Sequence, residues 1–407
     1  MSNANGAMHF DSVKDLDVRG KRVLVREDLN VPMTDSPSGR AIADATRIDG
    51  ALPTLRYLHE HGAKTIILSH LGRPDGRVTP KHSLKPLAAA LSEKLGVPVS
   101  FANACLGAPA RDAVAAMNDG DLLLLENVRF HSGEERNDPD FTRGLAELGD
   151  LYINDAFGTA HRAHASTEGL AHLLPSAAGL LMQAELRALA GLLANPAQPF
   201  VCVIGGAKVK DKVGVFTALM ERVRAFCIGG GMANTFLAAK GINVGASLRD
   251  DDLQPAKAII ALAQQKNVAL HLPVDAVAST SFENEGGART VDLSDLGDAM
   301  ILDIGPKTAA AYARVIETAR TIVFNGPMGV YEKAAYQQGT KIVGEAIARA
   351  TAAGAVSVVG GGDAAAAAHK LGFAAQMTHV STGGGATLEF LEGKILPGIA
   401  ALTKARA

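Results

Sequence analysis

Apolar residues follow two alternating patterns along most of the chain. Short, nearly continuous apolar runs alternate with longer stretches in which apolar residues recur every three or four positions. The first pattern is typical of strands buried on both faces and the second of amphipathic helices, so the alternation predicts an α/β fold with parallel sheets covered by helices. The predicted strands are KRVLVRED (21–28), KTIILSH (64–70), DLLLLENVRF (121–130), LYINDAF (151–157), PFVCVIGG (199–206), RAFCIGGG (224–231), VALHLPVD (268–275), TIVFNGP (321–327), AVSVVGGG (355–362) and THVSTGGG (378–385).

The segment from Pro175 to Pro199 departs from this alternation. Its central part, LLMQAELRALAGLLA, is strongly helical, and NPAQP follows it. Paired prolines end a helix because proline cannot continue the backbone hydrogen bonds. We interpret this helix as the connector between two α/β domains of similar size.

Composition and charge exclude several classes of protein. The chain has 40 Lys and Arg against 42 Asp and Glu and contains no Trp, so nucleic-acid binding is not expected. No uncharged apolar run approaches ~18 residues and the amino terminus lacks the layout of a signal peptide, so no membrane span and no secretion are expected. Cys105, Cys202 and Cys227 form no CxxC pair, which excludes a disulfide framework and a cysteine zinc site and fits a reducing cytoplasm.

Charged residues follow the predicted strands of the first half. Ligands of open α/β sheets bind outside the carboxyl ends of the strands, so these residues are candidates for one site. Arg47 joins them if Asp44 caps a helix and so places Arg47 in its first turn. Four arginines in such positions predict an anion site, because the planar guanidinium matches carboxylate and phosphate oxygens. The candidate residues are Asp28, Asn30, Arg47, His70, Arg73, Arg129 and Arg162.

The stretch GTAHRAH (158–164) admits two interpretations. His161 and His164 are three apart, a spacing that suits zinc if the segment is helical. Arg162 between them suits an anion instead. Nothing in the sequence supplies an obvious third zinc ligand beside them, so we favour the anion, with the histidines as orienting or packing groups.

Glycines follow the predicted strands of the second half. They form four loops, at 205–206, 229–231, 360–362 and 383–385. Glycine allows a close backbone approach, and the helix that follows offers free N–H groups to phosphate, so the loops predict a nucleotide site. The P-loop motif does not occur. Residues 360–365 match GxGxxA, but the acidic residue expected ~20 positions later is missing, so a nicotinamide cofactor is only the alternative.

Charged side chains accompany these glycine loops. Lys208 and Lys212 are four apart and are predicted to share a face just inside the helix after Gly205 and Gly206. Asp363 precedes an alanine-rich helix, where it suits an N-cap, a magnesium ligand beside phosphate oxygens, or both.

These motifs, taken in order, resemble those of the phosphoglycerate kinase family. The resemblance covers nearly the whole chain and is carried by DLNVP, SHLGRP, LLENVRF, NDAFGTAHRAH, GGAKVKDK, IGGGMANTF, NGPMGVYE, GGGD and STGGGATLE. It implies two Rossmann-like lobes joined by a long helix: a glycerate-binding lobe at 1–178, a connector at 179–198, a nucleotide-binding lobe at 199–390, and a segment at 391–407 that returns to the first lobe. It also implies a cytoplasmic, monomeric enzyme of glycolysis.

The resemblance implies reversible phosphoryl transfer from 1,3-bisphosphoglycerate to ADP, giving 3-phosphoglycerate and ATP with Mg²⁺. The anion-site residues named above would bind the glycerate phosphate and carboxylate. The nucleotide would be bound by Gly206, Lys212, Gly230, Asn325, Glu332, Gly361, Gly362, Asp363 and Ala364, with Asp363 meeting Mg²⁺ and Glu332 the ribose. Arg47, Lys208 and Lys212 would act on the transferred phosphoryl group, assisted by the loop of Gly383, Gly384 and Gly385.

The chain departs from the family pattern at three positions. Ala364 stands where the family usually has threonine, Phe324 where it often has tryptophan, and Glu27 where a small or apolar residue is usual. We expect at most an altered nucleotide affinity from these changes. Because the two substrate sites are predicted on different lobes, direct in-line transfer would require a hinge closure that brings the reacting atoms within ~3–3.5 Å. A nicotinamide-dependent dehydrogenase and a non-catalytic nucleotide-binding protein are the rival functions.

Overall fold

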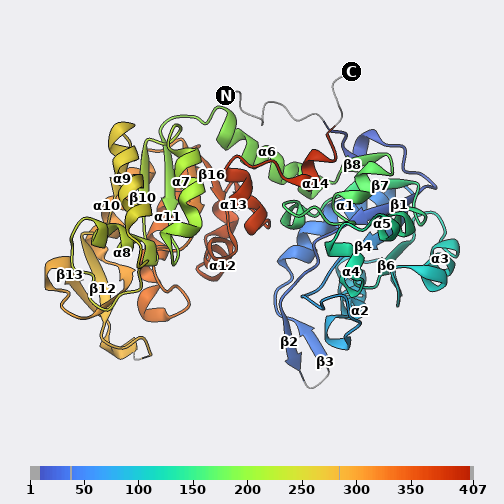
Figure 1. Ribbon diagram of the computed structural model, residues 1–407, viewed down its shortest axis with the longest axis horizontal. Coiled ribbons are helices and arrows are strands. Elements are labelled where there is room, and N and C mark those ends of the chain that lie inside the picture. The colour runs from blue at the N-terminus through green and yellow to red at the C-terminus, as the bar shows by residue number, and fades with distance from the viewer. Residues whose placement is uncertain (1–9, 37–38, 284, 404–407) are drawn as a thin grey trace. The chain divides into compact units, whose positions relative to one another are not determined.

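The chain divides into two compact units. The computed structural model describes residues 10–36, 39–283 and 285–403 (Figure 1). Unit 1 comprises Met1–Arg187 and Ile395–Ala407, and unit 2 comprises Ala188–Lys394. Residues 1–9 lie outside the described residues. They include most of the amino-terminal stretch that we interpret as lacking a signal peptide. Within the described ranges, no helix is long and apolar enough to cross a membrane.

Unit 1 is built on a parallel six-stranded sheet, as the apolar runs predict. The strands are, in spatial order, β5 (Val99–Ala102), β6 (Leu122–Leu125), β4 (Lys64–Leu68), β1 (Arg22–Arg26), β7 (Leu151–Asn154) and β8 (Ser176–Ala178). Every neighbouring pair is parallel, so all carboxyl ends meet at one edge of the sheet. A separate antiparallel hairpin of β2 (Met33–Ser36) and β3 (Gly39–Ile42) follows β1.

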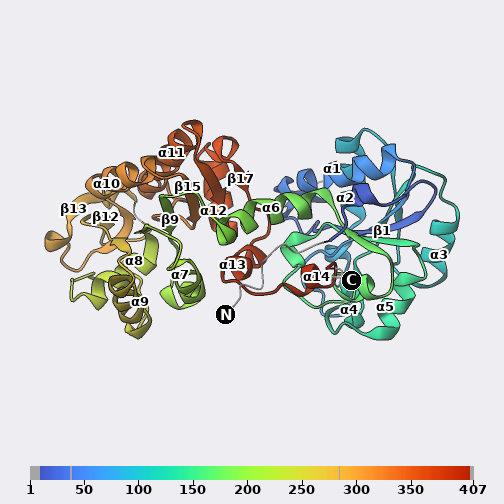
Figure 2. The same ribbon diagram turned by 90° about the horizontal axis from the view of Figure 1, so that it is seen from above.

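Helices cover both faces of this sheet. The helices α1 (Thr46–Glu60) and α2 (Lys85–Leu95) lie on one face, and α4 (Ser132–Glu135) and α5 (Pro139–Ala146) lie on the other (Figure 2). Helix α3 (Gly107–Ala115) packs on β5 and β6. The α1 and α2 face holds an apolar core, in which Leu55 and Leu91 pack with strand residues such as Val25 and Ile67.

The last described residues complete unit 1. Helix α14 (Pro397–Ala400) lies against the loop that follows β7. The backbone N–H of Gly398 donates to the carbonyl oxygen of Ala160 at 2.9 Å, and Asn154 Nδ2 donates to the Gly398 carbonyl oxygen at 3.3 Å. Residues separated by more than two hundred positions therefore share one packing unit.

Unit 2 repeats the parallel architecture and adds a second sheet. The main sheet has the order β11 (Ala269–His271), β10 (Ala225–Ile228), β9 (Phe200–Ile204), β15 (Thr321–Asn325), β16 (Val356–Val359) and β17 (His379–Val380), with every neighbouring pair parallel. An antiparallel sheet of β13 (Arg289–Asp292), β12 (Asp275–Ser279) and β14 (Met300–Ile304) lies beside it. The apolar pattern did not predict this second sheet, whose strands contain charged residues such as Asp275, Arg289 and Asp303.

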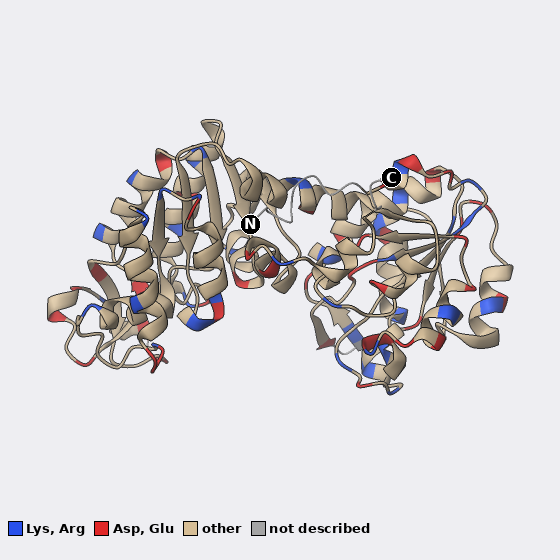
Figure 3. Cartoon of the chain, turned by 45° about the horizontal axis from the view of Figure 1, so that its top comes forward, with Lys and Arg blue, Asp and Glu red and all other residues tan. Residues whose placement is uncertain are grey.

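The main sheet of unit 2 is also covered on both faces (Figure 2). The helices α7 (Val213–Leu219), α8 (Gly230–Ala239) and α9 (Gln254–Gln265) lie on one side, and α10 (Pro306–Glu317) and α11 (Gln338–Ala352) lie on the other. Helices α12 (Gly362–Lys370) and α13 (Gly385–Leu391) follow β16 and β17. Figure 3 shows basic and acidic residues interspersed along the chain of each unit, which agrees with the net charge of −2.

Helix α6 (Leu180–Ala194) is the predicted helix LLMQAELRALAGLLA with the same two ends. Asn195 and Pro196 follow it, as the stop signal requires. The boundary between the two units falls inside this helix. All three cysteines are buried and unbonded, as expected for small apolar side chains.

Candidate active site

Four arginines surround His70 at the carboxyl edge of the sheet in unit 1. His70 follows β4 and is only 3% exposed. Burial is the largest cause that holds its pKa well below the usual range, and Arg26, Arg129, Arg47 and Arg162 lower it further in that order. Three of the four arginines predicted for the anion site therefore lie close enough to act on one side chain. The fourth member, Arg26, was not among the candidates.

Arg47 is held between the two polar residues that follow β1. Its Nη1 donates to Asp28 Oδ1 at 3.2 Å and to the Asn30 carbonyl oxygen at 2.9 Å. Asn30 Oδ1 in turn accepts from the backbone N–H of Gly72, in the loop after β4, at 2.8 Å. Asp28, Asn30 and Arg47 thus form one connected group, as the anion-site hypothesis requires.

The start of α1 differs by one residue from the predicted cap. Ala45 is the N-cap, and the carboxylate of Asp44 accepts from the backbone N–H of Thr46 at 2.7 Å. Arg47 still lies in the first turn of the helix. Arg73 belongs to the loop after β4, where its side chain is exposed.

Arg129 is a buried cation. It is 4% exposed, its Nη1 donates to the Gly72 carbonyl oxygen at 3.0 Å, and its Nε lies 3.3 Å from Glu135 Oε1 in an ion pair. Burial lowers its pKa to about 10, against the opposing effect of Glu135. The guanidinium is therefore charged at neutral pH and only partly compensated by protein, which suits the binding of an anion.

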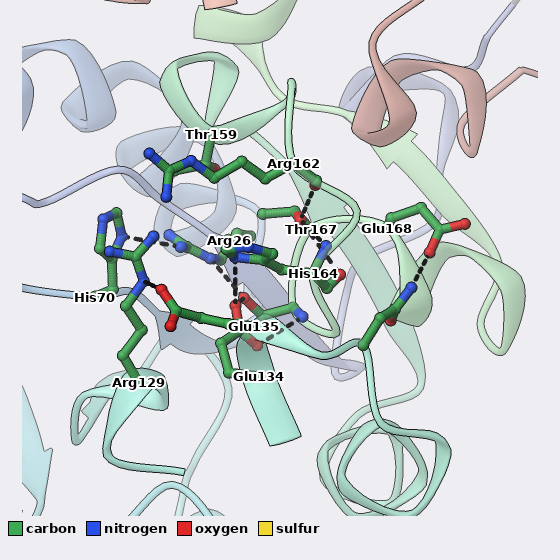
Figure 4. Close-up of polar contacts among 12 residues, drawn as sticks. Arg26, His70, Arg129, Glu134, Glu135, Thr159, Arg162, His164, Thr167 and Glu168 are labelled. Carbon is green, nitrogen blue, oxygen red and sulfur yellow. Dashed lines mark hydrogen bonds and ion pairs between the residues drawn. The ribbon is translucent and has the colours of Figure 1, made fainter. Parts of the chain in front are cut away.

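The sequence analysis did not predict a relay of buried hydrogen bonds at the arginine site, which is formed by Arg26, Ser166 and Glu134. Arg26, the last residue of β1, is 1% exposed, and its Nε donates to Ser166 Oγ at 2.8 Å. Ser166 donates from Oγ to Glu134 Oε1 at 2.6 Å and from its backbone N–H to Glu134 Oε2 at 3.0 Å (Figure 4). Its position at the carboxyl end of a predicted strand, like that of the other candidates, was the available signal for Arg26.

The GTAHRAH segment does not form a continuous helix. The 3₁₀ turn over Phe157–Thr159 ends before His161, so the helical spacing that zinc binding assumed is wrong. His164 is partly buried among arginines, and burial followed by Arg129, Arg26 and Arg162 lowers its pKa to about 3. A dication placed here would face these positive charges, whereas an anion would be attracted by them.

A cavity of about 410 Å³ opens at the carboxyl edge of the main sheet in unit 2. Of the residues predicted to bind nucleotide, Gly206, Gly230, Glu332 and Asp363 line it. Its remaining wall is mostly apolar, with side chains such as Leu248, Met300 and Val330. A mostly apolar pocket with a few polar groups at one end is typical of small-molecule sites.

Glycine is required where the loops after β9 and β10 meet. Gly230 has φ of +67°, and a Cβ at this position would lie 2.8 Å from both the N and the O atoms of Gly206. A Cβ on Gly205 would lie 2.0 Å from the Pro327 carbonyl oxygen. These three glycines let the backbone segments approach closely at the rim of the cavity.

Lys212 and Lys208 do not share a helical face, and that prediction is wrong. Residues Val209–Lys212 form a 3₁₀ turn, and α7 begins only at Val213. Lys208 is exposed, whereas Lys212 Nζ donates to the carbonyl oxygens of Gly205 and Asn325, both at 2.6 Å. Burial lowers the pKa of Lys212 to about 8, and Asp363 is among the groups that oppose the shift.

The loop after β16 carries the predicted carboxylate at a helix start. Gly361, with φ of +100°, is the N-cap of α12, so Asp363 lies in the first turn and the predicted N-cap role is wrong. Ala364 is 1% exposed and packs into the core. Asn325 Nδ2 donates to the Gly360 carbonyl oxygen at 2.7 Å, while its buried Oδ1 accepts no hydrogen bond from the described part of the chain.

The last glycine loop leads into α13. Gly384 has φ of +53° and is the N-cap, Gly385 is the first helical residue, and the N–H of Gly383 donates to Ser381 Oγ at 3.1 Å. Gly362 is the first residue of α12. With the loop 229–231, whose Gly229 is the N-cap of α8, three of the four predicted phosphate loops end at helix N-termini, where free N–H groups favour anions.

Asp303 is a further cavity residue that sequence reasoning missed. It is 1% exposed, and its Oδ2 accepts from the backbone N–H of Gly339 at 2.7 Å. Burial raises its pKa to about 7, against the opposing hydrogen bonds from Gly339 and Ile304. Its carboxylate thereby holds the start of α11 beside the segment that carries Glu332.

The chain matches known proteins along nearly its whole length. The family model for phosphoglycerate kinase matches residues 13–394. Phosphoglycerate kinases of Moorella thermoacetica and Chloroflexus aurantiacus are 52% and 51% identical, over 97% and 98% of this chain and 99% and 100% of theirs. The solved phosphoglycerate kinase structure from Coxiella burnetii is similar with a TM-score of 0.86 and 43% identity, covering 97% of this chain and 99% of that one. The chain belongs to the phosphoglycerate kinase family.

Proposed function

We propose that this enzyme catalyses reversible phosphoryl transfer from 1,3-bisphosphoglycerate to ADP, giving 3-phosphoglycerate and ATP, with the glycerate bound by unit 1 and the nucleotide by unit 2. The observation that carries the proposal is the gathering of Arg26, Arg47, Arg129 and Arg162 around His70. A site of this charge fits a small substrate that bears both a phosphate and a carboxylate.

The acceptor chemistry means that the proposed reaction needs no general base at the arginine site. In the ATP-consuming direction the acceptor is a carboxylate with a pKa near ~3.5, which is already ionised at neutral pH. His70 is held neutral by its buried, arginine-rich surroundings. The residues of unit 1 therefore have to bind and orient two anionic groups, and we assign this to Asp28, Asn30, Arg47, His70, Arg73, Arg129 and Arg162.

We propose that the cavity of unit 2, together with the loops beside it, binds the nucleotide. We assign the apolar wall to the base, Glu332 to the ribose, and Gly206, Gly230, Asn325, the loop Gly361–Ala364 and Lys212 to the phosphate end. With a pKa of about 8, Lys212 is mostly protonated at pH 7 and carries the positive charge that this role requires.

Asp363 fits the role of a Mg²⁺ ligand. Its carboxylate lines the cavity at the first turn of α12 and is exposed to solvent. Within residues 10–36, 39–283 and 285–403, no group of three or more His, Cys, Asp or Glu side chains could hold a metal. A single carboxylate is sufficient because Mg²⁺ in kinases takes most other ligands from phosphates and water. When bound, the ion neutralises phosphate charge.

We assign Arg47 and Lys212 to charge on the transferred phosphoryl group, with Lys208 and the loop Gly383–Gly385 assisting. A well-placed cation of this kind contributes ~10³-fold or more to the rate. Closure of the lobes about the connecting helix stays a prediction. From the cysteines we infer a reducing cytoplasm and from the family resemblance a monomer, and light scattering during gel filtration checks the oligomeric state.

The test is turnover of ATP and 3-phosphoglycerate, followed as NADH oxidation through coupled glyceraldehyde-3-phosphate dehydrogenase. Wild type should turn over, and Arg47→Ala should lose about 10³-fold or more in kcat. Arg56→Ala removes an exposed arginine from the same helix and is the matched control. Full activity in Arg47→Ala would remove Arg47 from the mechanism, and an inactive, folded wild type would refute the proposed function.

A further inference from the structure

The relay beneath the arginine cluster ends on His70. Figure 4 shows Glu134, Arg26 and His70 in one chain of contacts, which Ser166 completes. The last link joins Arg26 Nη2 to His70 Nδ1 at 3.1 Å. Both ends of this relay are buried, with Glu134 at 0% and His70 at 3% exposure.

The direction of this last hydrogen bond is fixed by chemistry. A guanidinium has five N–H donors and no acceptor, so His70 Nδ1 must accept. Nδ1 is then unprotonated, and the ring proton of a neutral imidazole has to reside on Nε2. Among the described residues, no hydrogen bond reaches His70 Nε2, so its N–H is available to a ligand. The low pKa of His70 agrees with a neutral ring.

Glu134 holds Arg26 in place for this contact. Its carboxylate accepts two hydrogen bonds from Ser166. Burial raises the pKa of Glu134, and Arg26 is the largest of the groups that oppose this shift and stabilise the charged form. Because the Ser166 hydroxyl donates its hydrogen bond to Glu134, the lone pairs of Ser166 Oγ can accept a hydrogen bond from Arg26 Nε. Arg26 also donates from Nη1 to the Glu27 carbonyl oxygen, so hydrogen bonds on two sides hold its guanidinium group.

We propose that Glu134 and Arg26 are positioning residues that hold His70 as the neutral Nε2–H tautomer, so that His70 binds the glycerate anion as a hydrogen-bond donor without a charge of its own. The binding half of this inference rests on the proposed function, whereas the tautomer does not. Such a donor adds a directed hydrogen bond among the arginines, and its strength does not change as pH crosses the usual histidine range.

The tautomer is tested by ¹⁵N NMR of histidine-labelled full-length protein, with His70→Gln used to assign the His70 signals. We expect the chemical shift of an unprotonated nitrogen for Nδ1 and of a protonated nitrogen for Nε2, unchanged between pH 6 and 8. A protonated Nδ1, or a ring that titrates in this range, would overturn the inference whatever the activity of the enzyme.

Two pairs of variants test the consequence for binding. His70→Gln places an amide N–H near the position of Nε2, whereas His70→Asn does not reach it, so Gln should retain a lower KM for 3-phosphoglycerate than Asn. Glu134→Gln should raise this KM about 10- to 100-fold and disturb the His70 shifts, while Glu147→Gln, an exposed glutamate, should not. An unchanged KM for ATP shows that Glu134→Gln is folded.

The outcomes separate the inference from the proposed function. Normal His70 shifts in folded Glu134→Gln would overturn the positioning role. The expected shifts in wild type, together with equal KM values for wild type, His70→Gln and His70→Asn, would instead remove His70 from the proposed glycerate site.

Discussion

Glu27 is an ionisable residue where the family resemblance implies a small or apolar one, and its replacement should stabilise the protein. Glu27 follows β1 and is fully buried, and neither of its carboxylate oxygens has a hydrogen-bond partner within the described residues. Burial is the largest cause that raises the pKa of Glu27 well above the usual range. Asp155 raises this pKa further, Arg26 lowers it, and Asp28 raises it. We predict that Glu27→Met increases the free energy of unfolding of unit 1.

The expected increase in the free energy of unfolding has two parts. An unpaired buried polar group costs about 1–3 kcal/mol even when it is uncharged. The second part depends on pH, because a carboxyl whose pKa is raised by folding binds more protons in the native state than in the unfolded state. The contribution of Glu27 to the free energy of unfolding is therefore most favourable below the ordinary glutamate pKa of ~4.3. It falls by up to ~1.4 kcal/mol per pH unit as pH rises toward the pKa of Glu27 in the folded protein.

Thermal unfolding of wild type and Glu27→Met at pH 5, 6 and 7 measures both parts. The variant should unfold at a higher temperature by about 2–12 °C at pH 5, from ~2–4 °C per kcal/mol for a unit of this size. The difference should widen at pH 7. Glu147→Met makes the same change at an exposed position and should show neither effect. A Glu27→Met protein that is no more stable than wild type, or a difference independent of pH, would refute the reasoning.

Three further changes test other groups. Glu135→Gln should lower the KM for 3-phosphoglycerate about 2- to 5-fold in steady-state assays, because Glu135 competes with the substrate for Arg129; an unchanged or higher KM would contradict this. Wild-type unit 2 should lose stability as pH rises from about 4 to the Asp303 pKa of about 7, and Asp303→Asn should remove that slope in denaturant titrations; an unchanged slope would exclude Asp303. Gly205→Ala should weaken ATP binding in calorimetry and destabilise the protein by about 1–3 kcal/mol, because its Cβ meets a backbone oxygen at 2.0 Å. Gly191→Ala, in a helix and with no described atom within 4 Å, should be neutral for binding and stabilising by ~0.5–1 kcal/mol.

The parts of the fold that were predictable depend on local pattern. Each of the ten apolar runs contains a strand, and α6 has the predicted ends, because burial on both faces and proline stop signals act within a few residues. The arginines of unit 1 were found for a related reason. Parallel strands bring their carboxyl ends to one edge, so residues far apart in sequence become neighbours by topology alone.

The parts that were missed depend on contacts over long sequence distances. Arg26 reads as a strand residue, and its role becomes visible only when Ser166 lies beside it. Lys208 and Lys212 show a helical spacing, but the backbone there forms a 3₁₀ turn, and Lys212 donates to two carbonyl oxygens across the loop. Sequence spacing alone does not contain these competing interactions.

The return of residues 395–403 to unit 1 has a consequence for the growing polypeptide. Unit 2 is continuous in sequence, whereas unit 1 requires Gly398 against Ala160 and the end of β7. During synthesis, unit 2 therefore has all of its residues before unit 1 does, although unit 1 emerges first. A nascent chain would carry an incomplete first domain through most of translation, and the final step of folding would be the docking of its last helix.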